Sequence, residues 1–141
     1  MKRPAFYRTF EHTADLGIEV DAATEAELYA NAASAMFTEM LGAPPPRGDR
    51  ELVVRVEGRD REDLMVRWLN ELLYLAESRG VIFGHCRDLE LEEAGLRAVC
   101  LGIGLEEAAL EIATEIKAAT YHQIEVSRTD RGFRARIVFD L

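Results

Sequence analysis

The sequence has few cysteines and no long apolar run. Cys86 and Cys100 are its only cysteines, they form no C-x-x-C pair, and they fall far short of the density of a secreted disulfide scaffold. No stretch approaches the roughly 18 apolar residues of a membrane helix, and residues 1–10 lack the apolar core of a signal peptide. These absences argue against the secreted and helical membrane classes and predict a reduced, cytoplasmic protein.

Basic residues are also in the minority. The 141 residues contain 26 Asp and Glu against 17 Lys and Arg, which gives a net charge of −9. A surface of this sign repels a phosphate backbone, so no stable direct binding to nucleic acid is expected. An acidic surplus suits cations, basic partners or plain solubility. With 48% hydrophobic and 30% charged residues, the chain is predicted to fold as a single domain over residues 1–141.

Two amphipathic helices are predicted. Thr24, with a glutamate three residues later, is a suitable cap for the first, and Gly42 ends it. The second begins near Asp60, has Asp63 in its first turn and ends at Gly80. Apolar residues at helical spacing give each a packing face. They are Leu28, Tyr29, Ala32, Ala33, Met36, Phe37 and Met40 in the first helix, and Leu64, Met65, Trp68, Leu69, Leu72, Leu73 and Leu75 in the second.

The remaining apolar segments are predicted to be strands. Short links at 92–95 and 128–131 permit antiparallel hairpins. The predicted class is therefore α+β, with mostly antiparallel or mixed β-sheets packed with two main α-helices. The expected strands are Tyr7 to Phe10, Gly17 to Val20, Leu52 to Glu57, Val81 to Leu91, Leu96 to Gly102, Ala118 to Ser127 and Gly132 to Phe139.

Cys86 and Cys100 flank the link at 92–95, so a hairpin there brings them to nearly opposite positions. We interpret both as structural thiols, because an unpaired cysteine is commonly a small buried hydrophobic residue.

The segment Leu105 to Ile116 is ambiguous. Its composition is typical of a helix, yet it continues directly into a segment of strand-like composition. We expect a loop or a short helix with its glutamates on a solvated face.

A polar cluster, Glu11 to Asp15, lies between two predicted strands. Within it, His12 offers a nitrogen ligand and Asp15 an oxygen ligand for a metal ion. The alternative is structural, with Asp15 accepting loop amides and His12 forming a partly buried, hydrogen-bonded ring. A lone H-x-x-D has no second histidine of a zinc helix, so the residues by themselves favour the structural reading.

Two further anionic groups lie at the last residues, where Asp140 adds its side chain to the α-carboxylate of Leu141. If this strand lies beside the Gly17 to Val20 strand, these carboxylates and Asp15 form an all-oxygen pocket for a hard cation. The alternative is a frayed, solvated terminus.

Two other polar residues are candidates. His122 shares a predicted strand face with apolar residues, where a histidine is more often a core residue than a ligand. Glu71 lies four residues after Arg67 on the second helix, and such a pair usually stabilises a helix modestly. No catalytic triad order and no glycine-rich phosphate loop is present.

Four separate segments together resemble the archease family. They are FEHTADLGI at 10–18, WLNELLYL at 68–75, KAATYH at 117–122 and the terminal FDL at 139–141. The resemblance spans the whole chain in the order of the family.

The resemblance implies an accessory protein rather than an enzyme. Archeases serve the GTP-dependent tRNA-splicing RNA ligase that joins 3′-phosphate to 5′-hydroxyl ends, and they promote its guanylylation and multiple turnover. The resemblance assigns the metal ligands to Asp15, Asp140 and the carboxylate of Leu141. It implies a divalent cation, Ca²⁺ first and Mg²⁺ or Mn²⁺ as alternatives. His12, Glu71 and His122 are expected to support the ligands or to contact the partner.

Two other function classes stay open. One is a stand-alone divalent-metal phosphoesterase, in which Asp15 and Asp140 hold the ion and His12 or His122 acts as the base. The other is a metal-free chaperone or interaction domain whose acidic surface keeps it soluble.

Overall fold

The structure, a computed structural model, describes residues 3–12 and 15–141, and of Glu11 and His12 the main chain alone. The predicted α+β class is confirmed, and every strand pairing in the described part of the chain is antiparallel. The elements are β1 (Tyr7–His12), β2 (Asp15–Ala22), α1 (Glu25–Leu41), β3 (Arg50–Glu57), α2 (Arg61–Arg79), β4 (Val81–Glu92), β5 (Gly95–Gly104), β6 (Ala118–Ala119), β7 (Glu125–Thr129) and β8 (Gly132–Asp140).

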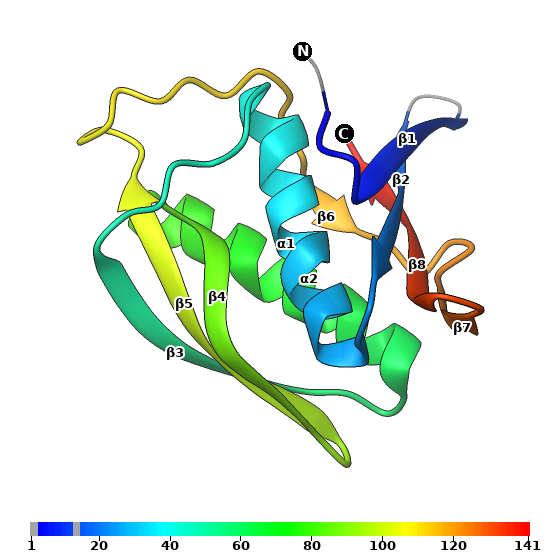
Figure 1. The fold of residues 1–141 in the computed structure, drawn as a ribbon. Coiled ribbons are helices and arrows are strands. Elements are labelled where there is room, and N and C mark those ends of the chain that lie inside the picture. The colour runs from blue at the N-terminus through cyan, green and yellow to red at the C-terminus, as the bar shows by residue number, and fades with distance from the viewer. Residues whose placement is uncertain (1–2, 13–14) are drawn as a thin grey trace.

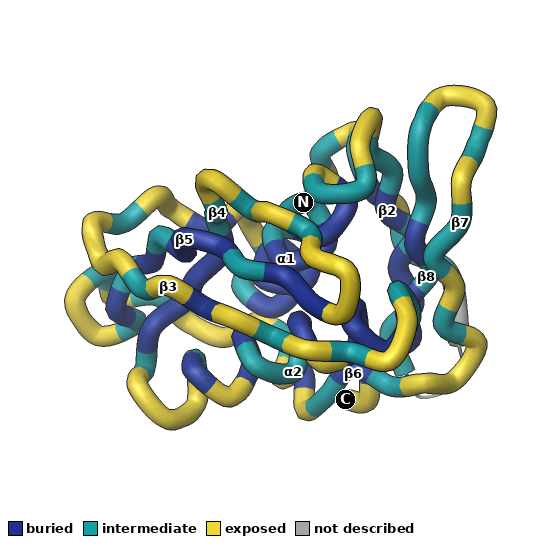
Figure 2. Tube along the Cα trace, turned by 90° about the horizontal axis from the view of Figure 1, so that it is seen from below, coloured by how far each residue is buried: buried dark blue, intermediate teal, exposed yellow. Residues whose placement is uncertain are grey.

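The described strands form two sheets. The larger has the order β1-β2-β8-β6, with β7 also paired to β8, and the smaller has the order β3-β5-β4. Both helices lie between the two sheets (Figure 1), so each sheet has one face on the core and the other toward solvent. Burial follows this arrangement: the helices are dark along their inner faces, whereas the loops are mostly exposed (Figure 2).

The helices supply the centre of the core. Every apolar residue predicted to form their packing faces is buried. The indole of Trp68 donates to the Tyr29 carbonyl at 2.8 Å, and the Tyr29 hydroxyl donates to the Arg61 carbonyl at 2.7 Å. These bonds satisfy the polar atoms of two large buried side chains and fix α1 against α2.

The predicted helix ends are confirmed. Thr24 Oγ1 accepts from the Glu27 amide at 3.1 Å, and Asp60 Oδ1 accepts from the Asp63 amide at 2.8 Å. Both helices end at a glycine in the left-handed conformation, as the sequence indicates. Neither helix has the length and apolar composition needed to cross a membrane, and this holds for all the residues described.

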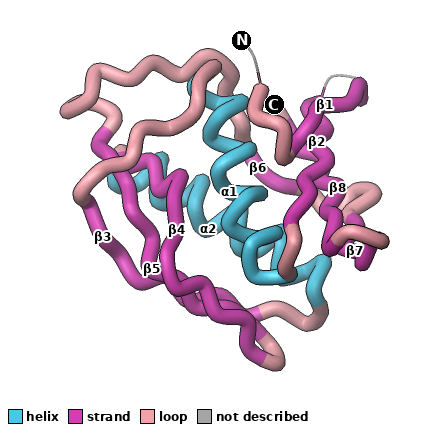
Figure 3. The backbone as a smooth tube through the Cα atoms, in the orientation of Figure 1, coloured by secondary structure: helices cyan, strands magenta, loops and turns pink. Residues whose placement is uncertain are grey.

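One predicted strand is wrong. The segment 118–127 is not continuous: β6 ends after two residues, a turn follows over 121–123, and β7 begins at Glu125. Gln123 has a φ of 54°, which a strand does not accommodate. The segment before β6, which was ambiguous, is a loop that runs from β5 to β6 over the ends of the helices (Figure 3).

The predicted hairpin around the cysteines is confirmed. Cys86 on β4 is the direct cross-strand partner of Cys100 on β5, and their sulfur atoms are 4.0 Å apart. Both are unpaired thiols, and Cys100 is fully buried.

Candidate functional site

The pairing of β2 with β8 brings two sequence-distant carboxylates together. Asp15 is the direct cross-strand partner of Asp140. Residues that face each other across antiparallel strands point to the same side of the sheet with Cβ atoms about 4.5–5.5 Å apart. The condition set by the sequence, that the last strand lie beside the second, is therefore met.

Alternation places these carboxylates on the outer face of the larger sheet. Ile18 and Val20 on β2, and Ile137 and Phe139 on β8, point inward and are buried. Asp15 and Asp140 alternate with these residues and therefore point outward. Leu141 follows the end of β8 and is 40% exposed. The end of β8 thus lies beside the first residue of β2.

Most of that outer face is a network of ion pairs. Along β2, Glu19 faces Arg136 and Asp21 faces Arg134. The shortest N–O distances are 2.7 Å for Arg136–Glu19 and 2.8 Å for Arg134–Asp21. Arg8 on β1 bridges both acids, at 2.8 Å from Glu19 and 2.7 Å from Asp21. Burial alone would raise the pKa of Asp21, but hydrogen bonds from Arg134 and Arg8 outweigh it and hold this pKa below its usual value.

The pairing of an acid on β2 with an arginine on β8 does not extend to Asp15. There β8 presents Asp140 where the two earlier rows have an arginine, so an acid faces an acid. Within the described residues, the carboxylate of Asp140 has no hydrogen bond or ion pair. Like charges directly opposite destabilise a sheet, and a bound cation would lower the repulsion between these two carboxylates.

A stacked aromatic ring separates the row from the ion pairs. Phe10 on β1 faces Gly17 on β2, and a Cβ at Gly17 would lie 2.2 Å from the Phe10 ring. The ring therefore lies directly over the glycine. The guanidinium of Arg136 stands 3.8 Å from the centre of the same ring, on the β8 side. The F-x-x-x-x-x-x-G spacing of the first motif thus has a steric cause.

The segment 117–119 closes the other side of the row. Ala118 pairs with Asp140, and the Lys117 amide donates to the Asp140 carbonyl at 2.9 Å. The outer edge of β6 is bound by a side chain in place of a further strand: Asn70 Nδ2 donates to the Ala119 carbonyl at 3.1 Å, and the Ala119 amide donates to Asn70 Oδ1 at 2.8 Å. The second and third motif segments therefore meet and support the strand beside Asp140.

The next residues leave the sheet to bind α2. The hydroxyl of Tyr121 donates to Asp63 Oδ1 at 2.5 Å, and the other oxygen of Asp63 accepts from Arg67 at 3.0 Å and from the Arg59 amide at 2.9 Å. The Tyr121 hydroxyl, then the Arg59 amide and Arg67, hold the pKa of Asp63 well below its usual range. This anchor is the reason that the predicted strand is interrupted.

The three supporting candidates have different places. His12 pairs with Asp15 through the main chain, but its side chain lies outside the described residues. His122 is exposed in the turn after β6, which is a correction, because its predicted apolar strand face is not formed. Glu71 is half-buried on α2; the expected pair with Arg67 is wrong, because Arg67 binds Asp63 one turn earlier. Their roles at the site stay predictions.

The proposed metal ligands are carboxylates, which suit a hard cation. Carboxylate oxygens are the ligands that Ca²⁺, Mg²⁺ and Mn²⁺ favour. Over the side chains that are described, no three His, Cys, Asp or Glu residues form a metal-binding cluster. The predicted site has two such side chains, Asp15 and Asp140, and takes its third donor from the main-chain carboxylate of Leu141.

Several residues that position the site were not predicted from the sequence. The acids of D-x-G-x-E-x-D in β2 and the arginines of R-x-R in β8 could have been, because their spacing places each set on one face of its strand. Asn70 and Tyr121 lie in the second and third segments that resemble the family, but nothing in the sequence indicated their contacts with Ala119 and Asp63, which are 49 and 58 residues away in the chain.

Comparisons with known proteins agree on one family. The profile of the Archease protein family (MTH1598/TM1083) matches residues 7–141. The chain is 37% identical over 139 residues to protein archease of Methanosarcina barkeri, covering 96% of this chain and 95% of that one. It is 36% identical over 138 residues to protein archease of Archaeoglobus fulgidus, covering 96% and 98%.

Two solved structures share the fold. The solution structure of protein 1598 of Methanobacterium thermoautotrophicum matches with a TM-score of 0.69 at 26% identity, over 96% of this chain and 99% of that one. The crystal structure of an archease of Thermotoga maritima, called there a "possible chaperone", matches with a TM-score of 0.61 at 24% identity, over 100% and 98%. The second likeness concerns the fold alone.

Proposed function

Since this chain belongs to the archease family, we propose that it is a metal-binding accessory protein of the GTP-dependent tRNA-splicing RNA ligase in the cytoplasm. In this role it promotes guanylylation of the ligase and multiple turnover, and it catalyses no reaction itself. The observation that carries the proposal is the row in which Asp15 faces Asp140, on a sheet face where the other acids face arginines.

The proposed ligands are Asp15, Asp140 and the α-carboxylate of Leu141, with Ca²⁺ as the preferred ion and Mg²⁺ or Mn²⁺ as alternatives. When bound, the ion supplies a positive centre for oxygen ligands of a partner. The protein's part is to hold the carboxylates in place. The ion-pair network fixes β2 against β8, and Asn70 fixes β6 on the far side.

The proposal also uses the charge of the molecule. A net charge of −9 favours approach to a basic protein surface and disfavours the RNA itself. We infer that the acidic end of the sheet docks near the nucleotide site of the ligase and favours the conformation that accepts the guanylyl group.

The test is a turnover count. The purified protein is mixed at substoichiometric and equal ratios with the RNA ligase of the same organism, GTP and Mn²⁺, and ligations per ligase are counted. Turnovers well above one are expected with the wild type and with Asp130→Asn, a matched control in the exposed β7–β8 turn. Asp15→Asn and Asp140→Asn should abolish the gain while retaining the fold. Variants that fold and still stimulate fully would refute the metal site.

The same preparations separate the other function classes. Hydrolysis of a phosphoester by the protein alone would favour the phosphoesterase. A melting temperature unchanged by millimolar Ca²⁺ or Mg²⁺ would favour the metal-free chaperone, because an ion that binds the native state specifically must stabilise it.

A further inference from the structure

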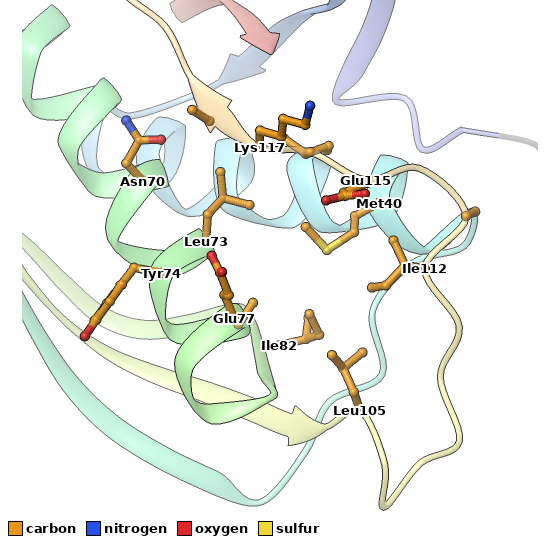
Figure 4. Close-up of a pocket in the computed structure, with 14 residues that line it drawn as sticks. Met40, Asn70, Leu73, Tyr74, Glu77, Ile82, Leu105, Ile112, Glu115 and Lys117 are labelled. Atoms are coloured by element: carbon orange, nitrogen blue, oxygen red, sulfur yellow. The ribbon is translucent and has the colours of Figure 1, made fainter. Parts of the chain in front are cut away.

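A groove of about 980 Å³ lies between α2 and the segment 105–117, close to the carboxylate row. Core side chains form its floor, among them Met40, Leu73 and Ile82, which are 0–7% exposed (Figure 4). Its volume is at the upper end of the range for ligand sites, but it is open to solvent rather than enclosed. Its shape therefore suits a chain segment better than an enclosed small molecule.

The outer wall of the groove is the loop that the sequence left ambiguous. It has no helix or strand, and loops of this length without secondary structure are uncommon in compact domains. Backbone hydrogen bonds hold it at intervals: Leu105 N to Gly80 O at 2.8 Å, Ala113 N to Met40 O at 2.8 Å, and Lys117 N to Asp140 O at 2.9 Å. The wall is thus fixed in place, and its last bond attaches it to the strand that carries Asp140.

Apolar side chains are exposed on both walls. Tyr74 on α2 is 62% exposed, and Ile112 on the loop is 45% exposed. They are two of the five large hydrophobic side chains that the described residues expose, and both line this groove. Ile112 points into the groove, whereas the ring of Tyr74 extends away from its centre and lies at its margin (Figure 4). Exposed apolar side chains at a depression mark a binding surface.

The rim of the groove is acidic. Glu77 on α2 and Glu115 on the loop lie on facing walls (Figure 4), both are exposed, and neither has an ion-pair or hydrogen-bond partner among the described residues. Glu111 is exposed on the same loop. One cation, Lys117, lines the end that adjoins Asp140. An apolar floor between two carboxylates complements a segment with one apolar face and flanking cations.

We propose that this groove docks a basic amphipathic helix of the partner protein, an inference that rests on the proposed accessory function. The helix inserts its apolar side chains over Met40, Leu73 and Ile82, and its lysines or arginines pair with Glu77 and Glu115. Nucleic acid and anionic lipid are disfavoured as occupants, because the rim repels phosphate. The groove is linked to Asp140 through the segment 117–118, whose Lys117 amide binds the Asp140 carbonyl.

The first test uses a labelled peptide of leucine and lysine of about 14 residues, roughly four helical turns, and measures fluorescence anisotropy. Reversal of the rim in Glu77→Lys/Glu115→Lys should weaken binding by roughly tenfold or more, and Tyr74→Ser/Ile112→Ser by a similar factor. All four positions are exposed, so the variants should keep their melting temperature. The matched controls are Glu57→Lys/Glu93→Lys and Val53→Ser. Val53 and Glu57 are exposed on β3 and Glu93 is exposed in the β4–β5 turn, so these variants should bind normally.

Two results would overturn the proposal. One is equal weakening by the Glu57→Lys/Glu93→Lys control, which would mean that the peptide senses net charge alone. The other is equal binding of a lysine peptide that has no apolar face.

The second test measures ligase turnover with the groove variants. We expect the amount of protein needed for half-maximal stimulation to rise roughly tenfold, and the peptide to compete. If the groove variants stimulate normally while Asp15→Asn does not, the groove proposal fails and the metal site stands. If the wild type itself gives no stimulation, the accessory function fails. The peptide measurement alone then tests the groove proposal.

Discussion

The side-chain amide of Asn70 provides a direct test of how the site is supported. Asn70→Ala removes both hydrogen bonds that the side chain makes to the amide and carbonyl of Ala119, a residue that is 4% exposed. A buried backbone group left without a partner costs about 1–3 kcal/mol. Alanine returns up to about 0.7 kcal/mol through its higher helix propensity.

The two unpaired groups together would cost about 2–6 kcal/mol, but water reaches the half-buried Asn70 position and satisfies part of the lost bonding, so the expected net loss is about 2–3 kcal/mol in the free energy of unfolding. For a protein of this size that corresponds to a fall of roughly 5–10 °C in melting temperature. Urea denaturation gives the free energy, and Ser78→Ala, on an exposed position of the same helix, is the control for helix propensity.

Hydrogen exchange gives an independent readout. The amide of Ala119 should lose protection in Asn70→Ala, whereas amides in the centre of α2 should lose only what the global free energy dictates. A melting temperature within about 1 °C of wild type, with the Ala119 amide still protected, would refute the claim that this side chain replaces a neighbouring strand.

Three further predictions follow from the same contacts. A peptide extension after Leu141 removes the proposed terminal ligand, so calorimetry should detect weaker Ca²⁺ binding; equal affinity would exclude that ligand. The folded-state pKa values of Asp63 and Asp21 are lowered, so their contribution to stability is present above the unfolded pKa near 4 and is lost as the pH falls through the folded values. Unfolding free energies below about pH 4 should show this decline, and Asp63→Asn should reduce its slope. Finally, Cys86 and Cys100, directly opposite at 4.0 Å, should form an intramolecular disulfide with a mild disulfide oxidant, seen as a mass loss of about 2 Da; only mixed adducts would contradict the cross-strand geometry.

The helices were predictable because their signals are local. A capping side chain binds an amide three residues away, and a terminal glycine adopts its left-handed conformation within the same turn, so Thr24, Gly42, Asp60 and Gly80 mark the ends by themselves. The β4–β5 hairpin was predictable for the same reason, since a two-residue turn joins its strands, but its register shifts between Arg87 and Glu90, and the sequence did not predict that shift.

The broken strand was not predictable from its composition. The β-branched and aromatic residues of 118–127 are typical of a strand, yet Tyr121 turns away to bind Asp63 on α2, 58 residues earlier. Arg67 could have paired with Glu71 on the same helix, but it binds Asp63. Asp63 also accepts hydrogen bonds from the Tyr121 hydroxyl and the Arg59 amide. A contact between elements outweighed the local preference in the first case. In the second case both alternatives are i, i+4 pairs on α2, and only the fold shows which of them forms.

The sequence by itself therefore determined the fold class, the helix ends, the candidate ligands and the likeness to archeases. Only the tertiary structure decided that Asp15 and Asp140 face each other, that arginines occupy the neighbouring rows, and that an acidic, apolar groove adjoins them. The reason is physical. Periodicity and capping depend on residues within one or two turns, whereas the register of β2 against β8 depends on how the whole core packs between the two sheets.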